Sequence, residues 1–384
     1  MRNKLFSLTL VLLFLLALGI LFGAQKEASV IEKRELSTVE DITLADLSDT
    51  AEETLKDQFV LRDSLNRMYY RTRIFFSSLF GKSNVNGAQV QVLTDEVSRI
   101  NNGYLLNSGL QYTKEELQSA ASRGYNVNEF AQRYPEVKTY VYFPTRYEEL
   151  LSADYGFAPE CQNSFKAQLS EGIQTASLNI DSLEIYQNYY YKSDSHWNAY
   201  GAYQGYTDVI DLIGKDFDLG EVRAVKEEVT YPYDFYGNIS AKICRLSEAD
   251  HLIDLKLEGE KPYDYYVNGE KTDLNSAKEE YAQKGNATIF SDYDLYFGDN
   301  AYERIFDFHQ EDKPNLLIFA DSYINTNMEW IASHFNRTVI LDLRARGTEF
   351  DLDHILKENG IDAALVLYYY NNMYFNGNEY IPLP

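Results

Sequence analysis

Hydrophobic and polar positions divide the chain into three parts. A mostly apolar run from Leu5 to Phe22 opens the sequence, and polar, acidic residues 25–50 without an apolar period follow it. From about Ala51 to Phe80, apolar residues recur at helical spacing. The pattern predicts a membrane segment over 1–24, a stalk over 25–50 and a folded domain over 51–384.

Within that domain, short apolar runs alternate with helical patterns, which predicts an α/β fold. Weak alternation from Val90 to Leu106 surrounds Asn101-Asn102-Gly103, a hairpin-turn signal. The expected strands are 138–143, 315–320, 337–341 and 363–368, and the expected helices are 114–123, 126–133, 165–172, 199–212, 325–335 and 351–359. Such alternation favours a mainly parallel sheet with helices on both faces. Residues 216–312, dense in Tyr, Asp and Gly, predict an irregular β-rich insertion that could wall a substrate cleft.

Two short strings supply an acid, an imidazole and a hydroxyl. Asp194 and His196 stand two positions apart in Ser193-Asp194-Ser195-His196-Trp197, so on an extended segment they would point the same way. Ser322 follows a predicted buried strand, where a loop carries a nucleophile at the edge of a sheet. A serine becomes nucleophilic when a base takes its proton and a third group orients that base. These residues are the candidate catalytic triad.

Each candidate also has a structural interpretation. Ser322 could cap the helix that follows its strand, and His196 could be a core histidine with satisfied nitrogens. Asp321 could serve as the acid instead, but adjacent side chains on an extended stretch diverge. We therefore favour Asp194 as the acid and expect Asp321 to hydrogen-bond the turn.

The segment Tyr191–Ala202 resembles the D-x-H-W segment of the bacterial DHHW proteins, which are similar to the SGNH-like domain of the alginate O-acetylation proteins. The stretch Asp57–Asp63 is similar to the D-x-F-x-x-R segment of that family. The resemblance implies a triad of Asp194, His196 and Ser322 on an SGNH/flavodoxin-like fold. Ser195 stands where the family name has its first His, and we expect it to point away from the site. As in the alginate-type branch, the histidine precedes the serine.

An acyl-transfer site also requires N–H donors for the developing oxyanion. The backbone amides of Ser322 and Tyr323 are the expected donors, because they lie near the start of a helix. The side chain of Asn325 is a further candidate. Gly237 and Asn238 resemble the glycine-containing block of the family, and at Gly237 the backbone could approach the substrate.

Tyrosine is abundant, with 33 residues, and one run adjoins the candidate acid. Tyr190, Tyr191 and Trp197 flank the Asp194–His196 pair and could line an open cleft and stack on sugar rings. Packing in the protein interior is the alternative, above all for Trp197.

The net charge and the N-terminal segment limit which partners the protein can bind and where in the cell it is expected. The net charge of −24 argues against nucleic acid and disfavours tight binding to anionic lipid, whereas a neutral glycan or amino sugar fits it. Arg2 and Lys4 precede the apolar run, so we expect an N-terminal membrane helix that anchors an extracytoplasmic domain, or a cleaved signal peptide and a secreted protein. The two cysteines, Cys161 and Cys244, could form a disulfide or stay unpaired.

The resemblance implies an O-acetyltransferase of the cell envelope that acts on a cell-surface or secreted glycan. A transferase of this kind needs an acyl donor from across the membrane, which implies a multi-pass membrane O-acyltransferase as partner. A glycan acetyl esterase and a glycan-binding or assembly protein without catalysis remain alternatives. No Cys/His metal spacing occurs, and we expect no cofactor.

Overall fold

A computed structural model describes most of the chain between residues 26 and 368. The described residues are Val11, 26–42, 46–59, 61–80, 82–85, 88–100, 103–107, 114–145, 160–232, 234–276, 278–279, 293, 296, 301–343 and 351–368. The stretch Thr288–Phe290, part of the predicted β-rich insertion, lies outside them.

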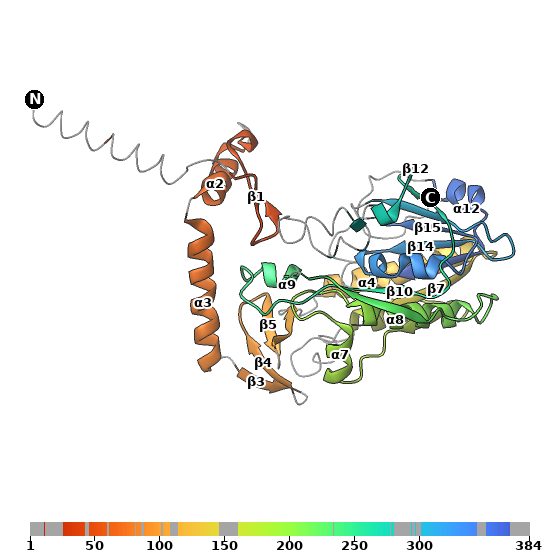
Figure 1. Ribbon diagram of the computed structural model, residues 1–384, viewed down its shortest axis with the longest axis horizontal. Coiled ribbons are helices and arrows are strands. Elements are labelled where there is room, and N and C mark those ends of the chain that lie inside the picture. Colours follow the sequence, from red (N-terminus) through yellow and green to blue (C-terminus); the bar gives the residue numbers. More distant parts are fainter. Residues whose placement is uncertain are drawn as a thin grey trace, which may run out of the picture.

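An eight-stranded sheet forms the centre of the molecule (Figure 1). In spatial order its strands are β12 (Glu270–Thr272), β11 (Asp264–Val267), β13 (Glu303–Asp307), β15 (Arg337–Leu341), β14 (Leu316–Ala320), β16 (Ala363–Leu367), β7 (Lys138–Phe143) and β8 (Gln174–Ser177). The last five are mutually parallel, and the first three add an antiparallel edge. The prediction of a mainly parallel sheet is confirmed.

The central strands β14 and β16 are buried at every position, as their continuous apolar sequences require. In their register Leu316 lies opposite both Thr338 of β15 and Ala363 of β16. Because all five parallel strands run in one direction, their carboxyl ends share one edge of the sheet. Ser322 comes two residues after the end of β14, at the middle of that edge.

Helices cover both faces of the sheet. They are α4 (Lys114–Arg133), α6 (Glu160–Lys166), α7 (Leu183–Tyr189), α8 (Ala199–Ile213), α11 (Met328–Ala332) and α12 (Leu352–Glu358). The 3-10 helix η5 (Ser322–Thr326) follows β14, and α9 (Asn238–Ala241) packs on the smaller, four-stranded sheet. On β7, the hydroxyl of Tyr142 donates to Asp208 of α8, whereas the next residue, Phe143, packs against Phe165 of α6. Successive strand residues point to opposite faces, so α8 and α6 lie on opposite sides.

Several predicted elements differ from the observed ones. The helix expected over 325–335 is divided into η5 and α11, and the helix expected over 165–172 ends at Lys166. Within 216–312, β11 to β13 extend the main sheet, whereas β9 (Val225–Thr230) and β10 (Ile253–Leu257) form a separate antiparallel pair.

The N-terminal part forms a unit of its own. It contains β1 (Ala28–Ser29), β2 (Arg34–Glu35), the 3-10 helix η1 (Val39–Asp41), α2 (Leu47–Gln58) and α3 (Arg62–Phe80). The predicted helix over 51–80 is thus two helices. A four-stranded antiparallel sheet follows, with β3 (Lys82–Val85), β4 (Ala88–Val92), β5 (Val97–Ile100) and β6 (Leu105–Asn107). β5 and β6 pair antiparallel on either side of the predicted turn, of which Asn101 and Asn102 lie outside the described residues.

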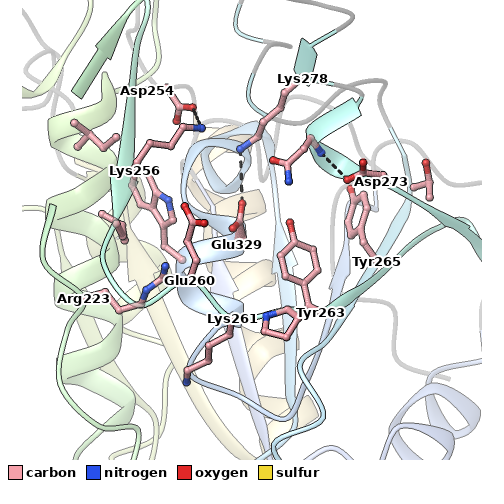
Figure 2. A pocket seen from close by; sticks show the side chains of 16 residues that line it. Arg223, Asp254, Lys256, Glu260, Lys261, Tyr263, Tyr265, Asp273, Lys278 and Glu329 are labelled. Carbon is pink, nitrogen blue, oxygen red and sulfur yellow. Dashed lines mark hydrogen bonds and ion pairs between the residues drawn. The ribbon is translucent and has the colours of Figure 1, made fainter. Parts of the chain in front are cut away.

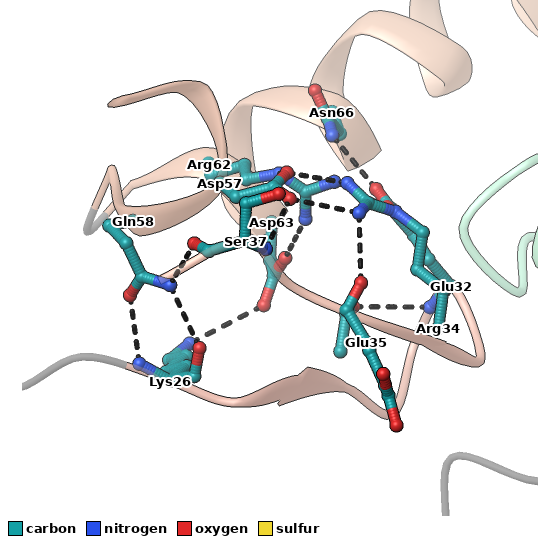
Figure 3. Close-up of polar contacts among 11 residues, drawn as sticks. Lys26, Glu32, Arg34, Glu35, Ser37, Asp57, Gln58, Arg62, Asp63 and Asn66 are labelled. Atoms are coloured by element: carbon teal, nitrogen blue, oxygen red, sulfur yellow. Dashed lines mark hydrogen bonds and ion pairs between the residues drawn. The ribbon is translucent and has the colours of Figure 1, made fainter. Parts of the chain in front are cut away.

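An ion-pair network fixes residues 26–37 onto the two helices (Figure 3). The buried carboxylate of Asp57 accepts hydrogen bonds from both guanidinium ends of Arg34 and from the Ser37 amide, and it lies 3.4 Å from Arg62. The Gln58 side chain pairs with the backbone of Lys26. The segment predicted as a stalk is therefore structured over residues 26–42, although it has no apolar period.

The predicted membrane segment Leu5–Phe22 lies outside the described residues, apart from Val11. Among the helices that the structure describes, none is both long and apolar enough to span a bilayer. Cys244 is a free, buried thiol, whereas the side chain of Cys161 lies outside the described residues. Burial raises the pKa of Cys244 to about 11.

We expect Asp57→Ala to release residues 26–42 from the helices, because it leaves Arg34 and the partly buried Arg62 without their shared carboxylate. The local cost should be on the order of 3 kcal/mol, as for a broken buried ion pair. Hydrogen exchange of the Leu36 amide, which bonds the Glu27 carbonyl, measures the effect.

Glu52→Ala is the matched control, since it removes only an exposed pair with Lys56 on the same helix. Exchange at Leu36 that is the same in both variants would show that the Asp57 network does not hold this unit.

Candidate active site

Asp194, His196 and Ser322 converge at the carboxyl edge of the parallel strands. His196 Nδ1 lies 2.6 Å from Asp194 Oδ1, and His196 Nε2 lies 2.7 Å from Ser322 Oγ. The acid is fully buried, whereas His196 and Ser322 remain partly exposed. The arrangement has an acid and a hydroxyl on opposite nitrogens of one imidazole, as a serine acyl-transfer site requires.

A local turn, rather than an extended segment, brings the acid to the imidazole. The Asp194 carboxylate accepts the backbone N–H of His196 at 2.9 Å, an Asx turn that places the ring beside the same oxygen. Residues 190–197 form a loop closed by an antiparallel bridge between Tyr190 and Trp197. The expectation of two parallel side chains on a strand is therefore wrong in its geometry, although the two groups do meet.

The second carboxylate oxygen of Asp194 is held from another part of the chain. The Asn238 amide donates to Asp194 Oδ2 at 2.7 Å, and the Asn238 side chain bonds the backbone and the hydroxyl of Ser195. Burial alone would raise the pKa of Asp194, but His196 and these hydrogen bonds outweigh it, so the pKa lies below its usual value. The acid is thus kept ionised, and it favours the tautomer with a proton on His196 Nδ1.

Ser322 is the first residue of η5, and its neighbours determine which amides remain for an oxyanion. Asp321 caps the helix by accepting the Tyr323 amide at 2.9 Å, which confirms the expected role of Asp321 in the turn. The Tyr323 amide is therefore already bonded, and the prediction that it serves the oxyanion is wrong. Within the described residues the Ser322 amide has no acceptor, so it is the remaining backbone candidate.

The aromatic residues predicted to line a cleft are all enclosed. Tyr190 stacks on Tyr186 and donates its hydroxyl to the Thr145 carbonyl. The hydroxyl of Tyr191 bonds that of Tyr296. Tyr190 and Tyr191 are at most 3% exposed, so neither ring can stack on a sugar, and the predicted role is wrong for both.

Trp197 is completely buried against the small residues of α8. A Cβ atom on Gly205 would lie 2.7 Å from the indole ring, and one on Gly201 would lie 2.9 Å from Trp197 Cβ. The ring also packs edge-on against Tyr323, whose hydroxyl donates to the Ser195 carbonyl. Trp197 thus supports the loop between the acid and the imidazole, and the predicted cleft role does not apply.

The remaining residues predicted to contact substrate are buried or support the acid instead. Asn325 is buried in η5, and Asn238 serves the acid as described above. Gly237 approaches Asp194 and not an open cleft: a Cβ atom there would lie 2.2 Å from Asp194 Cβ and 2.4 Å from Oδ2. Position 237 therefore requires glycine to leave room for Asp194, not for a substrate.

The structure adds residues that the sequence did not single out. Tyr293 stacks on the His196 ring with centroids 4.1 Å apart, and its hydroxyl bonds Thr326 of η5. Asp250 accepts the amides of Lys192 and Ser193 and the Ser193 hydroxyl. Both come from the tyrosine- and aspartate-rich segment after residue 216. That composition was the one feature of the sequence that could have pointed to them.

Comparison with known proteins identifies the fold. No protein-family model and no curated protein sequence matches the chain. The structure of Bacillus cereus PatB1 with a sulfonyl adduct superimposes with a TM-score of 0.61 at 20% identity, covering 74% of this chain and 98% of that chain. A DHHW family protein from Eubacterium siraeum superimposes with a TM-score of 0.55 at 18% identity, covering 78% and 95%. The chain has the fold of the DHHW proteins.

The resemblance inferred from the sequence is thus confirmed for the fold. The O-acetyltransferase domain of Pseudomonas putida AlgJ aligns more loosely, with a TM-score of 0.40 at 11% identity over 77% of this chain and 93% of that chain. Within the described part of this DHHW-fold chain, no cluster of His, Cys, Asp and Glu could hold a metal ion.

A separate cavity of about 380 Å³ lies between β10, β11 and α11 (Figure 2). Its charged side chains are largely paired: Asp254 with Lys256 at 2.6 Å, and Glu329 with Lys278 at 3.7 Å. None of the three triad residues lines it, so the reacting groups lie elsewhere.

We expect Gly237→Ala to displace Asp194, because the added methyl group overlaps the acid. The Asn238–Asp194 hydrogen bond should break, and the reactivity of Ser322 should fall by about 10²-fold, the loss typical of a small misplacement. Titration of Ser322 with a sulfonyl fluoride measures this reactivity. Gly172→Ala, where a Cβ atom meets nothing within 4 Å, is the control. Equal reactivity in both variants would mean that Gly237 does not position the acid.

We expect Asp194→Asn to cost on the order of 10⁴-fold in turnover. An amide has one acceptor oxygen, whereas Asp194 accepts from His196 on one side and from the Asn238 amide on the other. Whichever way the new amide is turned, its NH2 group faces an N–H donor, either of His196 or of Asn238. The imidazole then loses its preference for the Nδ1–H tautomer. Steady-state hydrolysis of a chromogenic acetyl ester gives the ratio, and a loss under tenfold would exclude Asp194 as the orienting acid.

Proposed function

We propose that this chain is a serine-dependent acyl-transfer enzyme, and that it places acetyl groups on hydroxyls of a glycan. The observation that carries the proposal is the Asp194–His196–Ser322 chain of hydrogen bonds, with distances of 2.6 and 2.7 Å. The DHHW fold and the similarity of the D-x-H-W segment to the alginate O-acetylation proteins support the acetyl group and the glycan.

In the first half-reaction, Ser322 Oγ attacks the carbonyl carbon of the acetyl donor and passes its proton to His196 Nε2. The Ser322 amide is placed to donate to the oxygen that becomes negative. When the tetrahedral intermediate collapses, the bond to the donor breaks, and His196 returns the proton to the leaving group. Ser322 is then acetylated, while Asp194 stabilises the imidazolium and remains ionised.

In the second half-reaction, a sugar hydroxyl attacks the acetyl-serine. His196 takes the proton of that hydroxyl, and the bond between Ser322 Oγ and the acetyl carbon breaks. The proton then passes from His196 to Ser322, and the acetylated glycan leaves. Water in place of the sugar would give acetate, so a transferase and an esterase share every residue of this site.

Tyr293 limits how acceptors reach the imidazole. Its ring covers one face of His196, and burial raises its own pKa well above the usual value, so the phenol stays neutral. A neutral ring beside the base excludes water from that side without competing for its proton. An acceptor, whether a sugar hydroxyl or water, must therefore reach His196 from the remaining open side.

We further propose that the domain works outside the cytoplasm, held by the segment Leu5–Phe22, and that a multi-pass membrane O-acyltransferase supplies its acetyl donor. The leading Arg2 and Lys4 and the need for a donor across the membrane motivate this part. Protease treatment of intact cells tests the location: a domain that stays protected until the cells are broken would contradict it.

We expect a sulfonyl fluoride to modify Ser322 covalently, since PatB1, which shares the fold, has been solved with a sulfonyl adduct. Ser322→Ala and His196→Ala should each abolish the mass increase, and the double variant should be no worse than either, because the residues act as one unit. Intact-mass spectrometry followed by peptide mapping measures the label.

Ser177→Ala is the matched control, since Ser177 ends another parallel strand, β8, at the same edge of the sheet. Labelling that persists in Ser322→Ala would overturn the assignment of the nucleophile, whereas a parent chain that takes no label would favour the glycan-binding alternative. With the labelled site established, acetylated oligosaccharide as product identifies a transferase, and acetate alone identifies an esterase.

A further inference from the structure

Helix α3 presents an apolar stripe to the solvent. Tyr70 and Ile74 face the body of the protein, where they pack on a small hydrophobic cluster formed by Leu93, Val97, Leu105, Ile239 and Ile243. Successive residues turn by about 100° around a helix, so residues seven or eight positions apart share a face. The face opposite Tyr70 carries the large, exposed side chains of Leu65, Met68, Phe75, Phe76 and Leu79, and the exposed Tyr69 and Phe80 lie along one edge of it.

This helix is also basic, in a chain whose net charge is −24. Arg67 and Arg71 lie on one flank of the stripe, between it and the face that contacts the body. Within the described part of the chain neither pairs with a carboxylate. On the other flank, Arg73 lies over the Tyr69 ring and 3.4 Å from Asp95. The single acid of α3, Asp63, pairs with Arg62 at its first turn.

We propose that α3 is an interfacial helix that inserts its apolar stripe into the surface of a membrane containing anionic lipid. Aromatic and aliphatic side chains on one face, flanked by arginines, are the composition of helices that lie in the plane of the headgroups. Each arginine near an anionic surface adds attraction that the rest of this acidic chain cannot supply. The helix lies at the edge of the molecule, apart from the eight-stranded sheet, where a flat surface can reach it (Figure 1).

The contact should involve the helix from Arg67 to Phe80. The residues before Arg67 lie against α2, where Asp49, Glu52 and Glu53 border a surface cavity shared with Leu65. These carboxylates would repel an anionic surface. Four of the exposed apolar side chains, at positions 75, 76, 79 and 80, lie beyond their reach on the last turns of α3.

A second copy of the chain fits the stripe less well than lipid does. Two α3 helices packed side by side would bring Arg67 and Arg71 of both chains toward the shared seam, with few carboxylates to neutralise them. Phosphate headgroups supply the negative charge that would pair with the arginines. Acyl chains are fluid, so they can accommodate phenylalanine side chains without a matched packing surface. We therefore assign the stripe to a membrane surface.

The test uses the full chain with tryptophan as a depth probe. Phe76→Trp places an indole on the stripe, and Tyr125→Trp places one at a 52% exposed position on α4 as the control. Trp197 and Trp330 are buried and give the same background in both variants. The proteins are mixed with vesicles of acyl-brominated phosphatidylcholine, with or without phosphatidylglycerol. Bromine in the acyl chains should quench the indole of F76W and not that of Y125W, and only when phosphatidylglycerol is present.

Charge reversal then tests the role of the arginines. R67E/R71E in the F76W background should reduce quenching to the level of Y125W, whereas K215E/K226E, two exposed lysines outside α3, should not. Phe80→Trp, at an 84% exposed position, repeats the measurement should F76W fail to fold. Equal quenching of F76W and Y125W would overturn the proposal, as would quenching that needs no anionic lipid. A lipid-free blue shift of F76W emission that grows with protein concentration would assign the stripe to a second copy instead.

Discussion

The whole site depends on one buried carboxylate. Asp194 lies at zero exposure, and its two oxygens are held by the imidazole and amide of His196 and by the amide of Asn238. An isolated charge at such a position would be very costly, so these donors must be in place whenever the protein is folded. The loop that carries the acid, the turn that presents Asn238 and the strand that presents Ser322 come from three distant parts of the chain. Each is therefore tied to the others through this group.

Sequence patterns predicted the centre of the molecule well, because buried parallel strands are short, nearly continuous apolar runs that alternate here with helical patterns. β7 and β15 have the predicted bounds, and β14 and β16 differ from the expectation by one residue. Residues 26–42 could not be predicted in the same way. Their structure rests on the ion pairs of Asp57 and the amide of Gln58, which are tertiary contacts that leave no periodic signal.

The triad residues could be named from the sequence, but the roles of their neighbours could not. Tyr190, Tyr191 and Trp197 look like cleft residues because they flank the acid and the imidazole. Whether they line a cleft or fill the core depends on their burial, which α7, α8 and residues after 216 determine. Asp321 was expected to hydrogen-bond the turn, but that its carboxylate occupies the Tyr323 amide, two residues later, became apparent only in the structure. Tyr293 reaches His196 from a segment about a hundred residues later, so only the fold could reveal it.

The close approach of Gly237 to Asp194 has a consequence for reading related sequences. The space between the two backbones is so small that a side chain at one position excludes the acid at the other. A chain that keeps the Asp-x-His-Trp string but carries a larger residue in place of this glycine has no room for the same hydrogen-bonded acid. The glycine, more than the string itself, should therefore separate chains of this fold that can hold the acid against the imidazole from those that cannot. A genome survey could apply that criterion without any further structure.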